Sequence, residues 1–436
     1  MVSLSSELPA GSPLPVERHN VSDSTDAALT PLWGPVTSLA LQNSPSSGLR
    51  LRDLPAFLRT LAEVKLAAVR ANQELGVLDE ARAGAIARAA REVADGEFID
   101  QFPLRVVATG GSTSTNMNVN EVLASRASQL LPDTAGLAVH PNDHVNRSQS
   151  SNDVYPTAAK VLLVRQALEV ASVLRRLARS FMRQAEQHDG VQRLGRTAWQ
   201  DAVLVPVSET HRAHALVAER FADQFAAAAE TLQAVQLGGT ALGTGVGAPA
   251  GFARLAVSNL AEITGLPMRP SVSRVDAFAH ADGYGLLADT AARCAGTLFK
   301  QSQDLRILSS GPTGGLGELV LPKLQPGSSI MPGKVNPVVP SMVGQASFSI
   351  RAAATAVGMA IAAGEPDYNP NSPAVVATLS PALSELAAVV LVFADKCIDS
   401  LHWNRSRLAE LTARPFDSLI EQAEKDGYDA VAGRSA

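Results

Sequence analysis

Apolar residues recur at the three- and four-residue spacing of amphipathic helices along most of the chain. One stripe follows Pro55 and a longer one follows Pro156. Because a helix turns once in about 3.6 residues, this spacing gathers the apolar side chains on one face. The same pattern predicts helices over about 206–233, 273–309 (ending at Gly311-Pro312, a stop signal), 338–363 and 378–401. Alternation typical of strands is rare, so the pattern predicts an all-α, mainly helical fold.

Polar segments interrupt these helices in three regions that lie far apart in the sequence. The regions are 109–118, then 148–153 together with 195–201, and finally 327–336. Helices of about 35 residues are stable only when packed in a bundle, and such bundles often assemble with other subunits. We expect a flexible arm over 1–30, a helical domain over 31–145, a long-helix bundle domain over 146–400 and a short C-terminal domain over 401–436.

Composition and charge narrow the function. Aromatic residues make up 4% of the chain, so Ala, Leu and Val must form the core, which favours close-packed helices. The net charge of −5 argues against a nucleic-acid partner. No uncharged apolar run reaches about 18 residues and no secretion signal is visible, which predicts a cytoplasmic protein without a membrane partner. Cys294 and Cys397 lie in apolar helical patterns and are expected to be buried free thiols.

The segment GSSIMPGKVNP at 327–337 carries the strongest chemical signal. Ser328 could act as a base if backbone N–H groups hold its oxyanion, and a glycine-rich backbone can supply them. Lys334 and Asn336 could stabilise a carboxylate that gains charge when a neighbouring C–H proton leaves. The competing interpretation is a surface loop with incidental polar residues.

Neutral hydrogen-bond donors in the other polar regions suit the same chemistry, because they can bind a carboxylate without a fixed charge. Helix capping is the alternative role for each of them. The candidates are Thr113, Ser150, Ser151, Asn152 and Thr197.

Two other candidate sites are weak. The Gly243-x-Gly245-x-Gly247 run lacks a preceding strand and a following GK[ST], so a nucleotide loop is not indicated. His140, Asp143 and His144 lack a second ligand pair at matching spacing, so no metal is expected.

The four polar segments together resemble the signature regions of the fumarase/aspartase superfamily, over about residues 32–399. They are TGGSTSTNMNVNEVLASRA at 109–127, HPNDHVNRSQSSND at 140–153, GRTAWQDAV at 195–203 and GSSIMPGKVNP at 327–337; SSGPTGGLGELVLP at 309–322 is also fumarase-like. The resemblance implies a homotetramer with a core of about 20 helices. It also implies active sites shared by three subunits, a small dicarboxylate substrate and no cofactor.

The resemblance further implies reversible anti elimination from a 2-substituted succinate to give fumarate through an aci-carboxylate intermediate. Ser328 matches the base, and Lys334 and Asn336 match the residues that hold the intermediate. His140, Asn142 and Asp143 match a secondary dicarboxylate site. The expected substrate contacts are Ser112, Thr113, Asn116, Ser150, Ser151, Asn152, Thr197, Ser329 and Met331.

The sequence departs from the family on the leaving-group side. Ala198 and Ser341 stand where fumarases carry a paired histidine and glutamate, and Trp199 could refill part of the space. A hydroxide-like leaving group needs a proton, whereas an amine needs less help. We therefore favour a C–N or other C–heteroatom lyase. The alternatives are a fumarate hydratase and a non-catalytic dicarboxylate-binding paralogue.

Overall fold

The computed structural model describes residues 31–132, 136–413 and 417–432. Leu32–Ala436 form one compact unit. The predicted arm at 1–30 lies outside the described residues, and the domain boundaries predicted within the rest stay predictions. The mainly helical fold is confirmed: the described strands are short and pair as β1–β2, β3–β4 and β5–β6.

The elements follow one another along the chain with few breaks in the helical pattern. The helices are α1 (Pro35–Gln42), α2 (Pro55–Glu74), α3 (Glu80–Ala94), α4 (Ser112–Leu130), α5 (Ser151–Gln187), α6 (Val207–Leu232), α7 (Phe252–Thr264), α8 (Arg274–Ala279), α9 (Asp282–Leu308), α10 (Val338–Ala362), α11 (Ser372–Val392), α12 (Arg405–Leu411), α13 (Asp417–Asp426) and α14 (Tyr428–Ala432). The strands are β1 (Gln192–Thr197), β2 (Gln200–Pro206), β3 (Ala234–Val235), β4 (Arg269–Pro270), β5 (Leu319–Val320) and β6 (His402–Trp403). Short 3-10 turns lie at Leu51–Asp53, Ile99–Gln101 and Ile398–Ser400, and π-turns at Pro141–Val145 and Phe393–Cys397.

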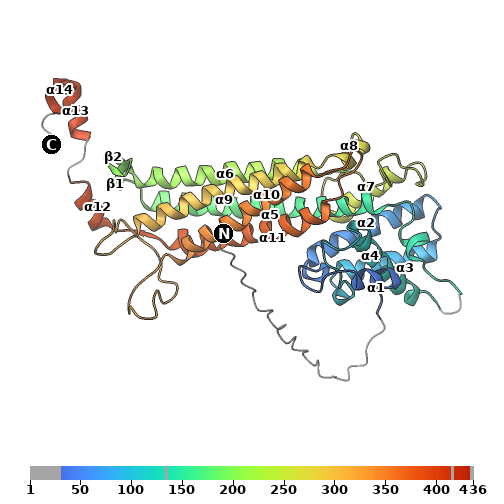
Figure 1. Cartoon of the computed structure of the whole chain (residues 1–436). Helices are drawn as coiled ribbons and strands as arrows, with labels where there is room; N and C mark the ends of the chain where they lie inside the picture. Colours follow the sequence, from blue (N-terminus) through green and yellow to red (C-terminus); the bar gives the residue numbers. More distant parts are fainter. Residues whose placement is uncertain (1–30, 133–135, 414–416, 433–436) are drawn as a thin grey trace, which may run out of the picture. The chain divides into compact units, whose positions relative to one another are not determined.

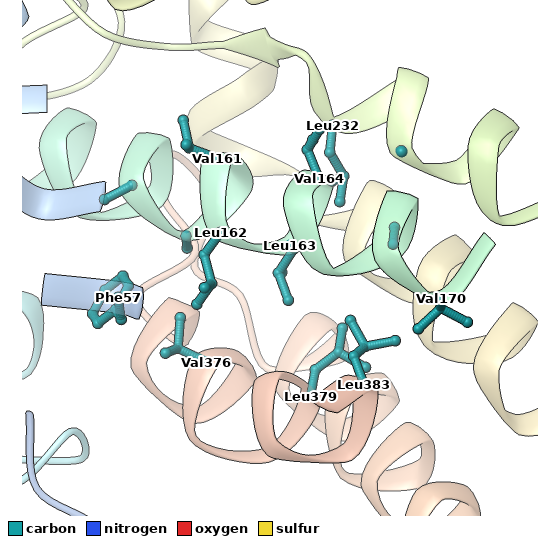
Figure 2. Packing of buried hydrophobic residues seen from close by; sticks show 14 of the residues in the cluster. Phe57, Val161, Leu162, Leu163, Val164, Val170, Leu232, Val376, Leu379 and Leu383 are labelled. Atoms are coloured by element: carbon teal, nitrogen blue, oxygen red, sulfur yellow. The ribbon is translucent and has the colours of Figure 1, made fainter. Parts of the chain in front are cut away.

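A bundle of long helices forms the centre of the fold, with α5, α6, α9, α10 and α11 side by side (Figure 1). Figure 2 shows how their apolar faces meet: Leu162 and Leu163 of α5 point toward Leu379 and Leu383 of α11. These side chains are almost fully buried, and each stabilises the fold by about 1.5–3 kcal/mol. The helices α1 to α4 lie at the end where α5 begins, and the β1–β2 hairpin and α12 lie at the other end (Figure 1).

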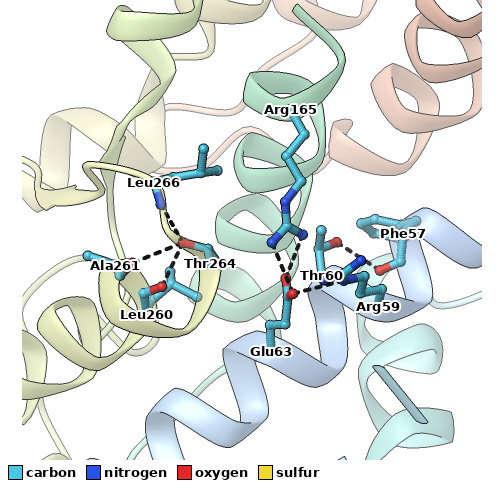
Figure 3. A network of polar contacts seen from close by, with 9 residues as sticks. All are labelled: Phe57, Arg59, Thr60, Glu63, Arg165, Leu260, Ala261, Thr264 and Leu266. Atoms are coloured by element: carbon cyan, nitrogen blue, oxygen red, sulfur yellow. Dashed lines mark hydrogen bonds and ion pairs between the residues drawn. The ribbon is translucent and has the colours of Figure 1, made fainter. Parts of the chain in front are cut away.

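A buried ion pair fastens the N-terminal helices to the bundle. The Glu63 carboxylate of α2 receives two hydrogen bonds from Arg165 of α5, at 2.7 and 3.0 Å, and one from Arg59 at 3.1 Å (Figure 3). The side chain of Glu63 is 4% exposed. Removing Arg165 would therefore leave a poorly compensated buried charge, which costs about 3–5 kcal/mol.

Two predicted elements were wrong in detail. The single helix expected over 273–309 is divided into α8 and α9 at His280 and Ala281. The Phe278 carbonyl accepts a hydrogen bond from the Asn369 backbone N–H at 2.8 Å, so it is engaged outside its own helix. The polar break expected at 195–201 is instead the central part of the antiparallel β1–β2 hairpin.

The segment Ser372–Ser400, which contains α11, is long and apolar enough to cross a membrane by length and composition alone. It nevertheless packs within the bundle, and 56% of its most apolar window is buried. The Gln166 amide of α5 donates to the hydroxyls of Ser380 and Ser384 at 3.0 and 2.9 Å. These contacts identify α11 as a core helix of the bundle.

The thiols of Cys294 and Cys397 are free and buried, which confirms the prediction. Burial raises the pKa of the Cys294 thiol well above its usual range and that of Cys397 to about 12. Both thiols are therefore protonated and unreactive near neutral pH.

Two histidines of α6 should make the fold sensitive to acid. Burial lowers the pKa of His211 to about 3 and that of His214 to about 4. An unfolded histidine titrates at about 6.5, so the unfolded chain binds more protons below that pH and stability falls as pH drops from about 6.5 toward 4. We expect His214→Phe, which keeps an aromatic ring against Phe181, to reduce this loss. Melting temperatures measured by circular dichroism between pH 7.5 and 4.5 test this, and equal slopes in both proteins would contradict it.

Candidate active site

The loop at 327–337 folds so that backbone N–H groups surround the oxygen of Ser328. Its Oγ accepts hydrogen bonds from the N–H groups of Ile330 at 3.2 Å and Met331 at 3.0 Å. These donors are of the kind that stabilise an alkoxide, because they point at the oxygen before any charge develops. Ser329, Met331 and Lys334 are exposed on the same loop.

The loop is closed by contacts between its two ends. The Asn336 side-chain amide donates to the Gly327 carbonyl. A Cβ on Gly327 would lie 2.1 Å from the Lys334 carbonyl oxygen, so only glycine fits at this position. Asn336 thus uses one amide hydrogen to close the loop and keeps a second for another acceptor.

A second group of candidate residues lies where two helices begin. Thr113 is the second residue of α4 and Ser151 is the first of α5, and their hydroxyl oxygens are 3.1 Å apart. The N-terminus of a helix carries unpaired N–H groups and a partial positive charge. Two helix N-termini that meet at exposed hydroxyls can bind a carboxylate without a cationic side chain.

Neighbouring residues hold this junction in place. Ser150 caps α5: its Oγ accepts from the Asn152 N–H at 3.2 Å. The Asn152 amide donates to the Ala241 carbonyl at 3.1 Å. Asp153 is fully buried and accepts N–H groups from Ser150, Gly238 and Thr240 at 2.9, 3.1 and 2.9 Å. Burial raises the pKa of Asp153 to about 7. These contacts join the start of α5 to the glycine-rich segment at 237–249.

Two of the predicted substrate contacts are buried beneath this junction. Ser112 is 6% exposed, and Asn116 is 3% exposed with its amide donating to Asn146 Oδ1 at 3.0 Å. Asn116 therefore supports the junction from the protein interior. Direct contact of Ser112 or Asn116 with a substrate stays a prediction.

The hairpin carries the third group. Thr197 is exposed at the end of β1, and the turn that follows consists of Ala198 and Trp199 with φ of 49° and 64°. Trp199 is 67% exposed and, with Ala198, lines a cavity of about 560 Å³, so whether it refills the space beside Ala198 stays a prediction. The Ser341 hydroxyl donates to the Pro337 carbonyl of its own helix at 2.9 Å.

The three groups do not meet within one chain. The helix α5 has 37 residues and, at about 1.5 Å per residue, spans about 55 Å. The junction of Thr113 and Ser151 lies at its first turn, and the hairpin with Thr197 follows its last. Arg196 of the hairpin pairs with Glu318 at 2.5 Å, which places the segment leading to Ser328 at the hairpin end.

Sequence reasoning missed the contribution of α12. Asn404 and Arg407 donate to the carbonyls of Gly317 and Leu316 at 3.1 Å each. Both residues line a cavity of about 880 Å³ together with Lys334 and Asn336. The helix α12 thus packs on the side of the loop at 327–337, although no spacing signal in the sequence links the two.

The predicted secondary site forms a capped π-turn. His140 Nδ1 accepts the N–H groups of Asn142 and Asp143 at 3.3 and 3.1 Å, and all three residues are exposed. Ligand binding there stays a prediction. Among the described residues, no group of three or more His, Cys, Asp or Glu side chains is placed to hold a metal ion.

Comparison with known proteins agrees with the sequence resemblance. A family model described as lyase matches residues 29–352. The chain is 38% identical over 403 residues to fumarate hydratase class II 2 of Bradyrhizobium diazoefficiens, covering 92% of this chain and 85% of the relative. It is 34% identical over 402 residues to an aspartate ammonia-lyase of Bacillus sp., covering 92% and 86%. The crystal structure of class II fumarase from Schistosoma mansoni superposes with a TM-score of 0.88 at 32% identity, covering 93% of this chain and 88% of that one.

Closure of the loop at 327–337 should depend on Gly327. We expect Gly327→Ala to open the loop, because the new Cβ would overlap the Lys334 carbonyl. Gly314→Ala is the matched control, since no atom lies within 4 Å of its new Cβ. Amide hydrogen exchange over 327–337 should rise several-fold in Gly327→Ala alone. Equal exchange in the two variants would show that the closure contact does not hold the loop.

Proposed function

The chain belongs to the fumarase/aspartase superfamily of lyases, and on this premise we propose that it converts a 2-substituted succinate reversibly to fumarate by anti elimination. Ser328 is the proposed base and the intermediate is an aci-carboxylate. The single observation that carries the proposal is the pair of backbone N–H groups that hold Ser328 Oγ. They favour the alkoxide, the form of serine that can remove a proton from carbon.

The charge that develops in the reaction has partners on the same loop. When the proton leaves the carbon beside a carboxylate, that carboxylate gains a second negative charge. The exposed ammonium of Lys334 and the remaining amide hydrogen of Asn336 can stabilise the added charge. Stabilisation that grows as the charge forms lowers the barrier and does not merely tighten substrate binding.

The other substrate carboxylate would bind at the junction of α4 and α5. Thr113 and Ser151 offer hydroxyls there, and the two helix N-termini add partial positive charge. Ser150, Asn152 and Thr197 would complete the contacts to the carboxylate and leaving group. All of these donors are neutral. The junction can therefore bind the dianionic substrate without a cationic side chain of its own, which would bind the dianionic product equally tightly.

We propose that the protein is a homotetramer with each site drawn from several subunits. The two halves lie at opposite ends of α5, about 55 Å apart, and a four-carbon dicarboxylate cannot bridge them within one chain. Large apolar side chains exposed on the bundle support assembly: Leu286 of α9, Phe348 and Met359 of α10 and Leu391 of α11. Antiparallel packing of bundles would bring opposite ends together.

The leaving-group side favours an amine or another heteroatom group over water. Ala198 has no polar side chain, and the Ser341 hydroxyl is engaged by its own helix. Neither can give a proton to a departing hydroxide. Fumarate hydratase is the second candidate, supported by the relative of that name at 38% identity. A non-catalytic dicarboxylate-binding paralogue is a third. We also propose a cytoplasmic location and no cofactor.

Replacing the base should abolish turnover. We expect the wild type to release fumarate from at least one of malate, aspartate and N-substituted aspartates, followed by ultraviolet absorbance and confirmed by NMR. Ser328→Ala should lower kcat about 10²- to 10⁴-fold. Ser406→Ala removes a hydroxyl that donates to Asn404 Oδ1 at the start of α12; this variant is the control and should retain wild-type activity.

The panel separates the three candidates. A best rate with an amino substrate supports the C–N lyase, and a best rate with malate supports the hydratase. Turnover of no substrate leaves the non-catalytic paralogue. Activity that survives Ser328→Ala would show that another group is the base.

Two inactive variants should restore each other if the site is shared. Ser328→Ala and Thr113→Ala remove groups from opposite ends of the bundle. In hybrid tetramers made by co-expression, about one site in four should receive both intact residues. We therefore expect the mixture to recover up to about a quarter of the wild-type rate, whereas the separate variants stay inactive. No recovery in verified hybrid tetramers would mean that both residues act from the same subunit or that the site is not shared.

A further inference from the structure

The ammonium of Lys65 is completely buried between α2 and the segment that leads into α5. Lys65 is 0% exposed. Its Nζ donates to Asn146 Oδ1 at 3.0 Å and to Gln149 Oε1 at 3.1 Å. Both acceptors are neutral amide oxygens on the segment 146–149. Burying an ammonium group costs free energy, and an apolar residue is usual at such a position. A buried lysine therefore indicates a specific role.

The segment 146–149 is held from the same side by further contacts. The Asn72 amide donates to the Arg147 carbonyl at 2.9 Å, and the Ser148 hydroxyl donates to Asn72 Oδ1 at 2.8 Å. Ser148 has a φ of 64°, a conformation that a non-glycine residue adopts only when its surroundings impose it. Thus two side chains of α2, Lys65 and Asn72, fix the path of the backbone just before Ser150.

Lys65 also lies within electrostatic reach of the start of α5. Burial lowers its pKa to about 7, and the charge of Asp153 opposes that shift. Asp153 in turn holds the Ser150 N–H and the loop at 238–240. Lys65 therefore supports the segment before the first turn of α5, and Asp153 anchors the turn itself.

We propose that Lys65 is a positioning residue that sets the affinity of the α4–α5 junction for a substrate carboxylate. By holding Asn146 and Gln149 it fixes the turn from which Ser150, Ser151 and Asn152 face Thr113. Without the ammonium, the amide oxygens of Asn146 and Gln149 lose a shared donor, and the turn shifts away from Thr113. This inference rests on the proposed function in one respect, namely that the junction binds the substrate carboxylate.

The test compares two lysines with similar hydrogen-bond acceptors in the full-length assembled protein. Lys65→Met removes the ammonium and keeps the length of the side chain. Lys160→Met is the control, because Lys160 is partly buried and its ammonium also donates to two oxygens, the Ala234 carbonyl and Gln236 Oε1 at 2.9 and 3.0 Å, away from 146–149. We expect KM for the best substrate to rise about 10- to 100-fold in Lys65→Met, with kcat changed no more than about threefold. Lys160→Met should keep the wild-type KM even where its melting temperature falls as far.

Hydrogen exchange gives a second measurement that does not need turnover. Peptides covering 146–152 should exchange faster in Lys65→Met and at the wild-type rate in Lys160→Met. If the wild type turns over no substrate, the proposed function fails, and this exchange measurement still decides whether Lys65 positions the turn. Wild-type exchange over 146–152 in a folded Lys65→Met protein overturns the inference, as does a KM that rises equally in both lysine variants.

Gln149→Leu keeps the test decisive if Lys65→Met does not fold. This variant retains the ammonium and removes one of its two acceptors. We expect the same changes in KM and exchange, with smaller size. A wild-type KM together with wild-type exchange in Gln149→Leu would rule out positioning through this contact.

Discussion

The uninterrupted length of α5 is the constraint on which the rest of the structure depends. Its 37 residues form one helix that continues past Pro156, although this proline has no N–H to donate within the helix. The ion pair between Glu63 and Arg165 and the apolar contacts with α11 fix this rod within the chain. The described helices before Ser151 are thereby held at one end, and the chain that follows Gln187 starts from the other. Because α5 is a rigid helix about 55 Å long, the fold fixes the distance between the two half-sites within one chain.

The helices could be predicted from the sequence because their apolar spacing is regular, and the bounds of α6 and α10 agree with expectation within about two residues. The hairpin could not be predicted, because its two-residue turn consists of Ala198 and Trp199, whereas such turns usually carry Asn and Gly. The division between α8 and α9 depends on Asn369, a partner far along the chain that local patterns do not reveal. Lys65 escaped notice for a related reason, because lysine in a helix pattern normally indicates an exposed face.

The candidate residues were identified from sequence, but their grouping was not: 148–153 was grouped with 195–201, whereas Ser151 lies against Thr113 at the start of α5 and Thr197 follows its far end. Composition marked Ser328, Thr113 and Ser151 as chemically suitable without indicating which of them share an end of the bundle. The structure places them in two groups: the loop of 327–337, which we propose abstracts the proton, and the junction of α4 and α5, which we propose binds a carboxylate. Helix capping and anion binding are compatible at this junction. Ser150 caps α5, and the same geometry exposes the helix N-terminus that an anion would approach.

The two proposed half-sites differ in charge, and this difference affects which step of the proposed reaction each would favour. The junction offers neutral hydroxyls and helix N-termini, so its attraction for a carboxylate changes little during the reaction. On the loop, the N–H donors around the serine oxygen would favour the alkoxide base before the proton moves, and the Lys334 ammonium would stabilise the charge that the carboxylate gains afterwards. Of the two residues proposed for the leaving-group side, Ala198 has no polar side chain, and the Ser341 hydroxyl of α10 donates to the Pro337 carbonyl. This distribution supports the proposed amine or other heteroatom leaving group, because the donors described above would then act on the half of the reaction in which carbon loses its proton.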